Sequence, residues 1–130
     1  MKSLALIPPS FLLLVSTSLA DWPFWRGDLA GSGVTTETKL PTEWDKEKNV
    51  KWRVALSEAG NSSPVISGDR IFLTQPNTGK KRRGLLCLDR KSGKTLWEKS
   101  VEYQTKERTH RTNHFCSSSP ATDDERVIVA

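Results

Sequence analysis

Short apolar runs separated by turn-forming residues dominate the second half of the chain. Residues 85–88 form a continuous apolar run, residues 89–94 are polar and contain one glycine, and residues 95–97 return to bulky side chains. An apolar run of this length is typical of a buried strand. Asp89 and Gly93 suit a tight turn, because Asp can bond nearby backbone groups and Gly tolerates positive φ. The pattern predicts a β-hairpin with Asp89 and Gly93 as its turn residues.

Residues 50–56 alternate strictly between apolar and charged side chains, with Val50, Trp52, Val54 and Leu56 on the apolar side. Strict alternation predicts a strand with one face against the core and one face in solvent. The segment resembles residues 95–101 in its tryptophan and flanking charges. We therefore expect Trp52 and Trp97 to occupy equivalent positions.

An internal repeat connects the middle of the chain with its last residues. The strand–turn–strand pattern of residues 62–74 recurs at residues 118–130, at a constant offset of 56 positions (119 − 63). Ser, Ser, Pro and Arg coincide, and in both copies a run of apolar residues follows the Arg. Asp124 replaces Gly68 and can also adopt positive φ.

Four predicted strands, at residues 62–66, 70–75, 85–89 and 95–101, form one antiparallel meander. Repeats of ~40–50 residues built from four strands are typical of β-propeller blades. The sequence therefore predicts an all-β protein made of propeller blades. Its expected parts are a lone last strand at 50–56, a complete blade at 62–101, an insertion at 102–117 and the start of the next blade at 118–130.

The partial neighbours predict a truncated propeller. Repeat architectures need neighbouring units to bury a shared core, and apolar runs such as 71–73 and 127–129 would otherwise face water. We expect that this chain does not fold stably alone and that residues 21–49 are poorly anchored.

The N-terminus has the features of a secretory signal peptide at residues 1–20. A short positive start precedes an apolar stretch, and small residues lie at the expected cleavage site after Ala20. We expect an exported protein, periplasmic or extracellular, without stable membrane insertion after cleavage. Residues 21–49 form an irregular arm whose Trp22, Phe24 and Trp25 dock on a preformed surface. The alternative is a stacking platform for a sugar or cofactor.

The distribution of charge argues against nucleic-acid binding. The formal net charge is +5 and the pI is about 9.4, with four consecutive basic residues at 80–83. Nucleic-acid binding is expected of a basic face with interleaved aromatic residues. The basic residues here are not arranged in that way, so we predict a solvated loop and no nucleic-acid partner.

Cys87 and Cys116 are the two cysteines of the chain. An exported protein permits a disulfide. Cys87 lies in the third predicted strand of one blade, and Cys116 lies just before the first strand of the next. Strands two apart in a sheet are about 10 Å apart, beyond the roughly 7 Å Cα limit for a bridge. We expect two separate thiols, unless the loop that carries Cys116 folds back.

Two further groups of residues could hold metal ions. His110, His114 and Cys116 lie within one polar loop and could ligate Zn²⁺, or the loop could simply be hydrogen-bonded at a blade edge. Asp123, Asp124 and Glu125 could bind Ca²⁺, although acidic residues in a two-strand turn are usually solvated. We assign no metal ligand and no catalytic residue, and the sequence contains no phosphate-binding loop.

Two strings carry a family resemblance. Ser-Ser-Pro-Val-Ile-x-Gly-Asp-Arg-Ile-Phe precedes Leu-Asp-x-x-x-Gly-Lys-x-Leu-Trp, and together they resemble the pyrroloquinoline-quinone-like propeller repeat over residues 50–130. The resemblance implies that Trp52 and Trp97 pack between neighbouring blades. The opening Trp-Pro-Phe-Trp-Arg-Gly-Asp also looks like the arm that precedes such propellers in exported proteins.

The family includes quinoprotein dehydrogenases and the propeller lipoprotein of outer-membrane β-barrel assembly. This chain lacks the adjacent Cys pair of the first, and residue 21, where a lipidated Cys would stand in the second, is Asp. We therefore expect a non-catalytic scaffold or binding surface without a cofactor, whose partners are proteins or the remaining blades. The alternative is the N-terminal part of a dehydrogenase, with pyrroloquinoline quinone and Ca²⁺ bound only in a complete propeller.

Overall fold

The computed structural model describes residues 21–105 and 108–130, and these residues form strands and loops only. The expected signal peptide, residues 1–20, lies outside the described residues. No helix that could cross a membrane is found in the part of the chain that is described. The protein is therefore all-β, as its sequence predicted.

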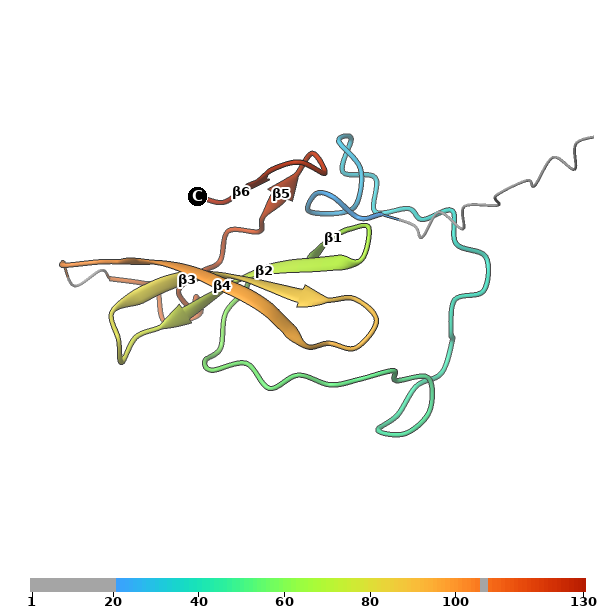
Figure 1. The fold of residues 1–130 in the computed structure, drawn as a ribbon, viewed down its shortest axis with the longest axis horizontal. Helices are drawn as coiled ribbons and strands as arrows, with labels where there is room; N and C mark the ends of the chain where they lie inside the picture. Colours follow the sequence, from blue (N-terminus) through green and yellow to red (C-terminus); the bar gives the residue numbers. More distant parts are fainter. Residues whose placement is uncertain (1–20, 106–107) are drawn as a thin grey trace, which may run out of the picture.

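The main sheet is an antiparallel meander of four strands in the order β1-β2-β3-β4 (Figure 1). Its strands are β1 (Val65–Ser67), β2 (Arg70–Asn77), β3 (Arg82–Asp89) and β4 (Thr95–Glu102). The prediction of a blade-like meander is confirmed. β1 begins three residues later than expected, after Pro64, whose missing N–H cannot join a ladder.

The middle strands are longer than predicted. β2 and β3 extend to the pairs Pro76↔Arg83 and Asn77↔Arg82. The basic run at 80–83 is thus only partly a loop, which corrects the expectation of a solvated segment. Long aliphatic stems let arginine cover a sheet while the charged end stays in water.

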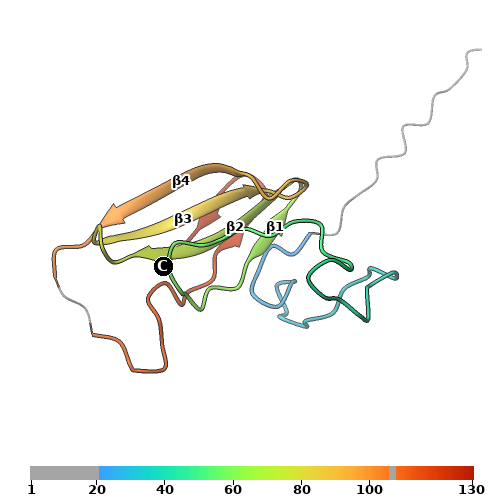
Figure 2. The ribbon, with the colours of Figure 1, turned by 90° about the horizontal axis from the view of Figure 1, so that it is seen from below.

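A second sheet pairs β5 (Ala121–Thr122) with β6 (Val127–Ile128). Figures 1 and 2 show this pair beside β1, with which β5 is in contact. The turns of the two repeats adopt the same backbone conformation, with φ of 53° at Gly68 and 73° at Asp124. The repeat predicted from the sequence is therefore present in the structure as well.

The expected strand at residues 50–56 is not formed. The segment is extended but pairs with no strand among the described residues. The alternation did predict which side chains face the core, because Trp52 and Val54 pack on Leu73, Leu86 and Leu88. The segment lies across one face of the sheet. Backbone hydrogen bonds between strands form only along a strand edge, so the segment cannot join the sheet from this position.

Each face of the main sheet has its own apolar cluster. One face buries Leu73, Leu86 and Leu88 beneath the extended segment 50–56. The opposite face buries Val65, Phe72 and Cys87, with Leu85, Trp97 and Val127 packed against them. The sheet is consequently a middle layer between segment 50–56 and the β5–β6 pair.

The N-terminal arm is anchored at its start, contrary to expectation. Trp22 exchanges two backbone hydrogen bonds with Ile66, of 2.9 and 2.8 Å, and the carbonyl of Pro23 accepts one from Thr122 at 3.0 Å. The arm thus caps the free edges of β1 and β5, because these edges offer unpaired backbone groups. Beyond residue 28 it is exposed, as its large apolar side chains show: Leu29 (86%), Val34 (73%) and Trp44 (71%).

Candidate functional site

The turn between β3 and β4 is held by Asp89 and Gly93. The Asp89 carboxylate accepts hydrogen bonds from the Ser92 side chain and from its backbone N–H, the latter at 2.6 Å. These two bonds lower the pKa of Asp89 below its usual value. Gly93 donates its N–H to the Asp89 carbonyl at 2.8 Å and has φ of 72°. Both residues therefore lie in the turn where the sequence placed them.

Trp52 rests on this turn. Its indole Nε1 donates to the Arg90 carbonyl at 3.0 Å. A Cβ on Gly93 would come within 2.6 Å of the Trp52 ring. Only glycine permits this close approach together with positive φ. The contacts of Trp52 lock segment 50–56 onto the sheet; its role between neighbouring blades stays a prediction.

Trp97 lies on the opposite face of the sheet. Its ring is tilted by 45° against Phe72, with ring centroids 5.9 Å apart, and the side chain packs on the cluster that includes Val127. Trp97 thus contacts the same cluster as the β5–β6 pair. Its indole N–H has no hydrogen-bond partner among the described residues.

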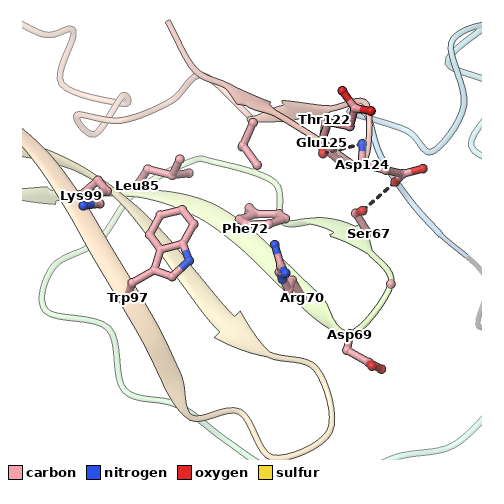
Figure 3. A pocket seen from close by; sticks show the side chains of 12 residues that line it. Ser67, Asp69, Arg70, Phe72, Leu85, Trp97, Lys99, Thr122, Asp124 and Glu125 are labelled. Atoms are coloured by element: carbon pink, nitrogen blue, oxygen red, sulfur yellow. Dashed lines mark hydrogen bonds between the residues drawn. The ribbon is translucent and has the colours of Figure 1, made fainter.

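Two adjoining hollows lie between β4 and the β5–β6 pair. The first measures about 550 Å³ and the second about 650 Å³, and Leu85 and Lys99 line both. Figure 3 shows Trp97 and Phe72 facing the first hollow, with Arg70 beside them. We call the two hollows together the β4 groove. Its walls are Leu85, Trp97, Lys99 and Val101 on the sheet, and Val127 and Val129 on the other side.

Charged groups border one end of the β4 groove. Arg70 and Lys99 provide positive charge, and Asp124 and Glu125 provide negative charge from the β5–β6 turn. Asp124 accepts a hydrogen bond from the Ser67 hydroxyl at 2.6 Å, which ties the two repeat turns together (Figure 3). This end is therefore polar and closed by contacts between the repeats.

Arg83 organises the other end. Its guanidinium carbon lies 4.0 Å from the ring centroid of Tyr103 and 3.9 Å from that of Phe115. Such stacking of arginine between two aromatic faces is attractive because the rings carry negative charge on their faces. It fixes both ends of the insertion against β3. Reasoning from the sequence missed this cluster, because Tyr103 follows β4 and Phe115 lies near the end of the insertion, so both rings are distant from Arg83 in sequence.

The candidate metal residues are engaged in local hydrogen bonds. His110 bonds to the Thr112 hydroxyl at 2.8 Å within its own loop, and the Cys116 carbonyl accepts from Thr74 at 3.2 Å. Asp123 bonds to Arg126 through backbone and side chain, and the backbone bond is the main cause of its lowered pKa. Within residues 21–105 and 108–130, no group of three or more His, Cys, Asp or Glu side chains could hold a metal ion.

The two cysteines are likewise separated. Cys87 is fully buried in the sheet beneath Trp97 and Phe72, and Cys116 is half-buried in the loop before the second repeat. No disulfide joins them. Burial raises the pKa of the Cys87 thiol, which makes it a poor nucleophile.

The comparisons with known proteins match this architecture to one family. A family model described as outer membrane protein assembly factor BamB matches residues 31–130, which include both sheets and the β4 groove. No curated protein and no solved structure matches the chain.

Proposed function

The chain belongs to the family of BamB and related pyrroloquinoline-quinone-like repeat proteins, and we propose that it is an exported, non-catalytic scaffold that binds other proteins. Its strands are of the β-propeller type. The expected signal peptide and the description of the family by an outer-membrane assembly factor support a periplasmic or extracellular location. The proposed partners are proteins or further propeller blades.

The β4 groove is the observation that carries this proposal. Its walls carry an indole, aliphatic side chains and three cationic side chains, Arg70, Arg83 and Lys99. Tryptophan and arginine contribute most of the binding energy at many protein interfaces, whereas lysine at the rim contributes mainly to specificity. The composition of the groove therefore fits a surface for another polypeptide.

Four aspartates have structural roles in turns. Hydrogen bonds within their own turns lower the pKa of Asp28, Asp45, Asp89 and Asp123, and none of the four is buried. A carboxylic acid that serves as a general acid or base near neutral pH needs a raised pKa instead. These four carboxylates are thus suited to holding turns together.

The alternative, part of a quinone-dependent dehydrogenase, finds no matching donor set. The resemblance implies an adjacent Cys pair against the quinone, whereas Cys87 is enclosed in the apolar core and Cys116 lies on a separate loop. Asp123 and Asp124 are engaged in hydrogen bonds of the two repeat turns. The described residues do not fit the cofactor, and we derive no step through it.

Cross-linking in the native host tests the proposal. A photo-reactive residue replaces Lys99 in the β4 groove, and the control carries it at Lys39 in the exposed arm. We expect a discrete protein adduct from position 99 that position 39 does not form. In parallel, the purified chain is mixed with pyrroloquinoline quinone and Ca²⁺ and passed over a gel-filtration column. Co-elution of quinone absorbance with the protein, together with dye reduction, would overturn the non-catalytic assignment.

A further inference from the structure

The turn between β2 and β3 presents two lysines on a well-held backbone. The Asn77 side chain accepts a hydrogen bond from the backbone N–H of Lys80, and the Thr78 carbonyl accepts one from that of Lys81, both at 3.1 Å. Glu58 accepts two further bonds from Thr78, at 2.7 and 2.8 Å. These bonds use backbone and hydroxyl groups, so the side chains of Lys80 and Lys81 stay exposed to solvent.

The insertion after β4 is held at the same end of the sheet. The backbone N–H of Tyr103 donates to the Lys81 carbonyl at 3.0 Å. The stacking of Arg83 on two aromatic rings fixes both ends of the insertion against β3. Figures 1 and 2 both show the insertion and the β2–β3 turn at one end of the main sheet. Arg108 and Arg111, which are exposed in the insertion, therefore share this end with the turn.

The positive charge at this end is not neutralised by the protein. The exposed cations of the two segments are Lys80, Lys81, Arg108 and Arg111, and we call these four side chains the basic end. None of them forms an ion pair with any residue that the structure describes. The two neighbouring carboxylates are already engaged, because Glu102 pairs with Arg82 at 2.7 Å and Glu58 bonds to the turn. The basic end is thus available for an external anion.

The opposite end of the sheet differs in charge. It contains the turns after β1 and β3, and the bond between Ser67 and Asp124 holds the β5–β6 turn beside them. Acidic and basic side chains are mixed in these turns, and Arg126 pairs with Asp123 at 2.8 Å. The acidic side chains of the three turns are Asp69, Asp89, Asp123, Asp124 and Glu125. Of the two ends of the sheet, the basic end is therefore the more positive, and the sheet is electrically polarised along its strands.

The kind of anion follows from what the basic end lacks. Protein interfaces gain most of their affinity from aromatic anchors, and single-stranded nucleic acids stack their bases on aromatic rings. Here the nearby rings, Tyr103 and Phe115, are only partly exposed and stack on Arg83 instead. A membrane with anionic headgroups needs no anchor of this kind. It attracts each nearby lysine or arginine through its surface potential and strengthens binding about fivefold per cation.

We propose that the basic end is a docking surface for a membrane that contains anionic phospholipid headgroups. The contact requires no insertion of the chain into the bilayer. It goes beyond the proposed scaffold function, because its partner is a lipid surface and not a protein. Four cations correspond to a partition coefficient on the order of 10³ M⁻¹. Docking is therefore weak and reversible, and it directs the mixed-charge end of the sheet away from the membrane.

Sedimentation with lipid vesicles tests the surface directly. Protein purified from the exported fraction is mixed with vesicles of phosphatidylcholine and phosphatidylglycerol, or with vesicles of phosphatidylcholine alone. We expect half of the protein to sediment with the mixed vesicles at about 1 mM accessible lipid. Binding should be lost in about 1 M salt, where charges are screened beyond roughly 3 Å. The neutral vesicles should leave the protein in the supernatant.

Three double variants locate the contact, because each removes two positive charges from exposed side chains. The first two change the basic end and the third changes the β3–β4 turn: Lys80→Gln with Lys81→Gln, Arg108→Gln with Arg111→Gln, and Lys91→Gln with Lys94→Gln. Each of the first two should weaken binding about thirtyfold. The third has the same net charge at the opposite end of the sheet, and its binding should change by less than about twofold. Circular dichroism verifies that all three variants retain the β-sheet.

Each outcome decides the proposal. Absence of binding at about 10 mM lipid overturns it, as does equal binding to neutral vesicles. Equal losses in all three double variants would show a response to net charge alone and also overturn it. Binding of duplex DNA or polyglutamate with the same dependence on the variants, without vesicle binding, would identify a different partner. Cross-links from Lys99 without vesicle binding would leave the scaffold function standing and reject only this inference.

Discussion

Replacing Gly93 with alanine should destabilise the sheet through the ring of Trp52. Gly93 has φ of 72°, and a methyl group there would come within 2.6 Å of that ring. Left-handed φ costs an L-residue about 1–2 kcal/mol, and reduced freedom of the unfolded chain returns roughly 0.4–1 kcal/mol. The net backbone cost is therefore about 1 kcal/mol.

Displacement of Trp52 accounts for the larger part of the lost stability. Its hydrogen bond to Arg90 is worth about 1 kcal/mol, and separation from Leu73, Leu86 and Leu88 over roughly 40 Å² costs about another 1 kcal/mol. The expected total for Gly93→Ala is thus about 3 kcal/mol. Gly68→Ala is the matched control, because Gly68 also has positive φ, at 53°, and nothing lies within 4 Å of its Cβ position. That variant should lose only about 1 kcal/mol.

Native-state hydrogen exchange measures both losses without requiring a cooperative unfolding transition. The amides of β3 report the opening of the sheet, and the indole N–H of Trp52 reports its own hydrogen bond. The difference of about 2 kcal/mol between the two variants should disappear in a Trp52→Ala background. Equal losses in the wild-type background, or a difference that survives Trp52→Ala, would refute the contact between Trp52 and the turn.

Four further predictions address other parts of the molecule. Arg83→Ala should speed proteolysis of the insertion, because it removes stacking on two rings worth about 0.5–2 kcal/mol, whereas Lys80→Ala should leave the cleavage rate unchanged. Ser92 lowers the pKa of Asp89 in the folded state. The contribution of Asp89 to stability is therefore present at neutral pH and is lost as the pH falls through that lowered pKa. Amide exchange at Ser92 should show this loss, and Asp89→Asn should abolish the pH dependence of that exchange. A thiol reagent should label half-buried Cys116 before fully buried Cys87, which should react only after denaturant is added; equal native rates would contradict the core assignment. Intact mass of exported protein should correspond to a chain that begins at Asp21, and full-length protein in the cytosol would exclude the signal peptide.

The main sheet could be predicted because its signals are local. Apolar runs are bounded by turn residues, and the turns after β1 and β3 have glycines at positive φ, Gly68 and Gly93. Hydrophobic alternation and turn chemistry act within a few residues of each other. The four strands therefore appeared with bounds that differ from the structure only near their ends.

The ends of β2 and β3 depend on distant partners. A run of four basic residues is typical of a loop, yet Arg82 forms an ion pair with Glu102 at 2.7 Å and Arg83 stacks between Tyr103 and Phe115. No local signal indicates these contacts, because the rings lie on either side of an insertion. Tertiary contacts here override the local structural preference of the sequence.

The start of the arm illustrates the same limit. Trp22 and Pro23 bond to the edges of β1 and β5, which belong to two different repeats. A segment broken by proline and glycine contains no strand pattern, so its pairing follows from the edges that the repeats leave open. The aromatic residues of the arm indicated that it docks, but the sequence did not indicate where. The expectation that Trp25 docks was wrong, because its side chain is 61% exposed.

Trp52 and Trp97 explain why the fold was easier to predict than the surroundings of each repeat residue. Both stand in the same sequence context, so the pattern assigns them one position in the repeat. Their surroundings differ, because Trp52 lies on a strand pair and its glycine turn, whereas Trp97 packs on Phe72 and borders the β4 groove. A repeat pattern describes the unit and not the neighbour that covers it.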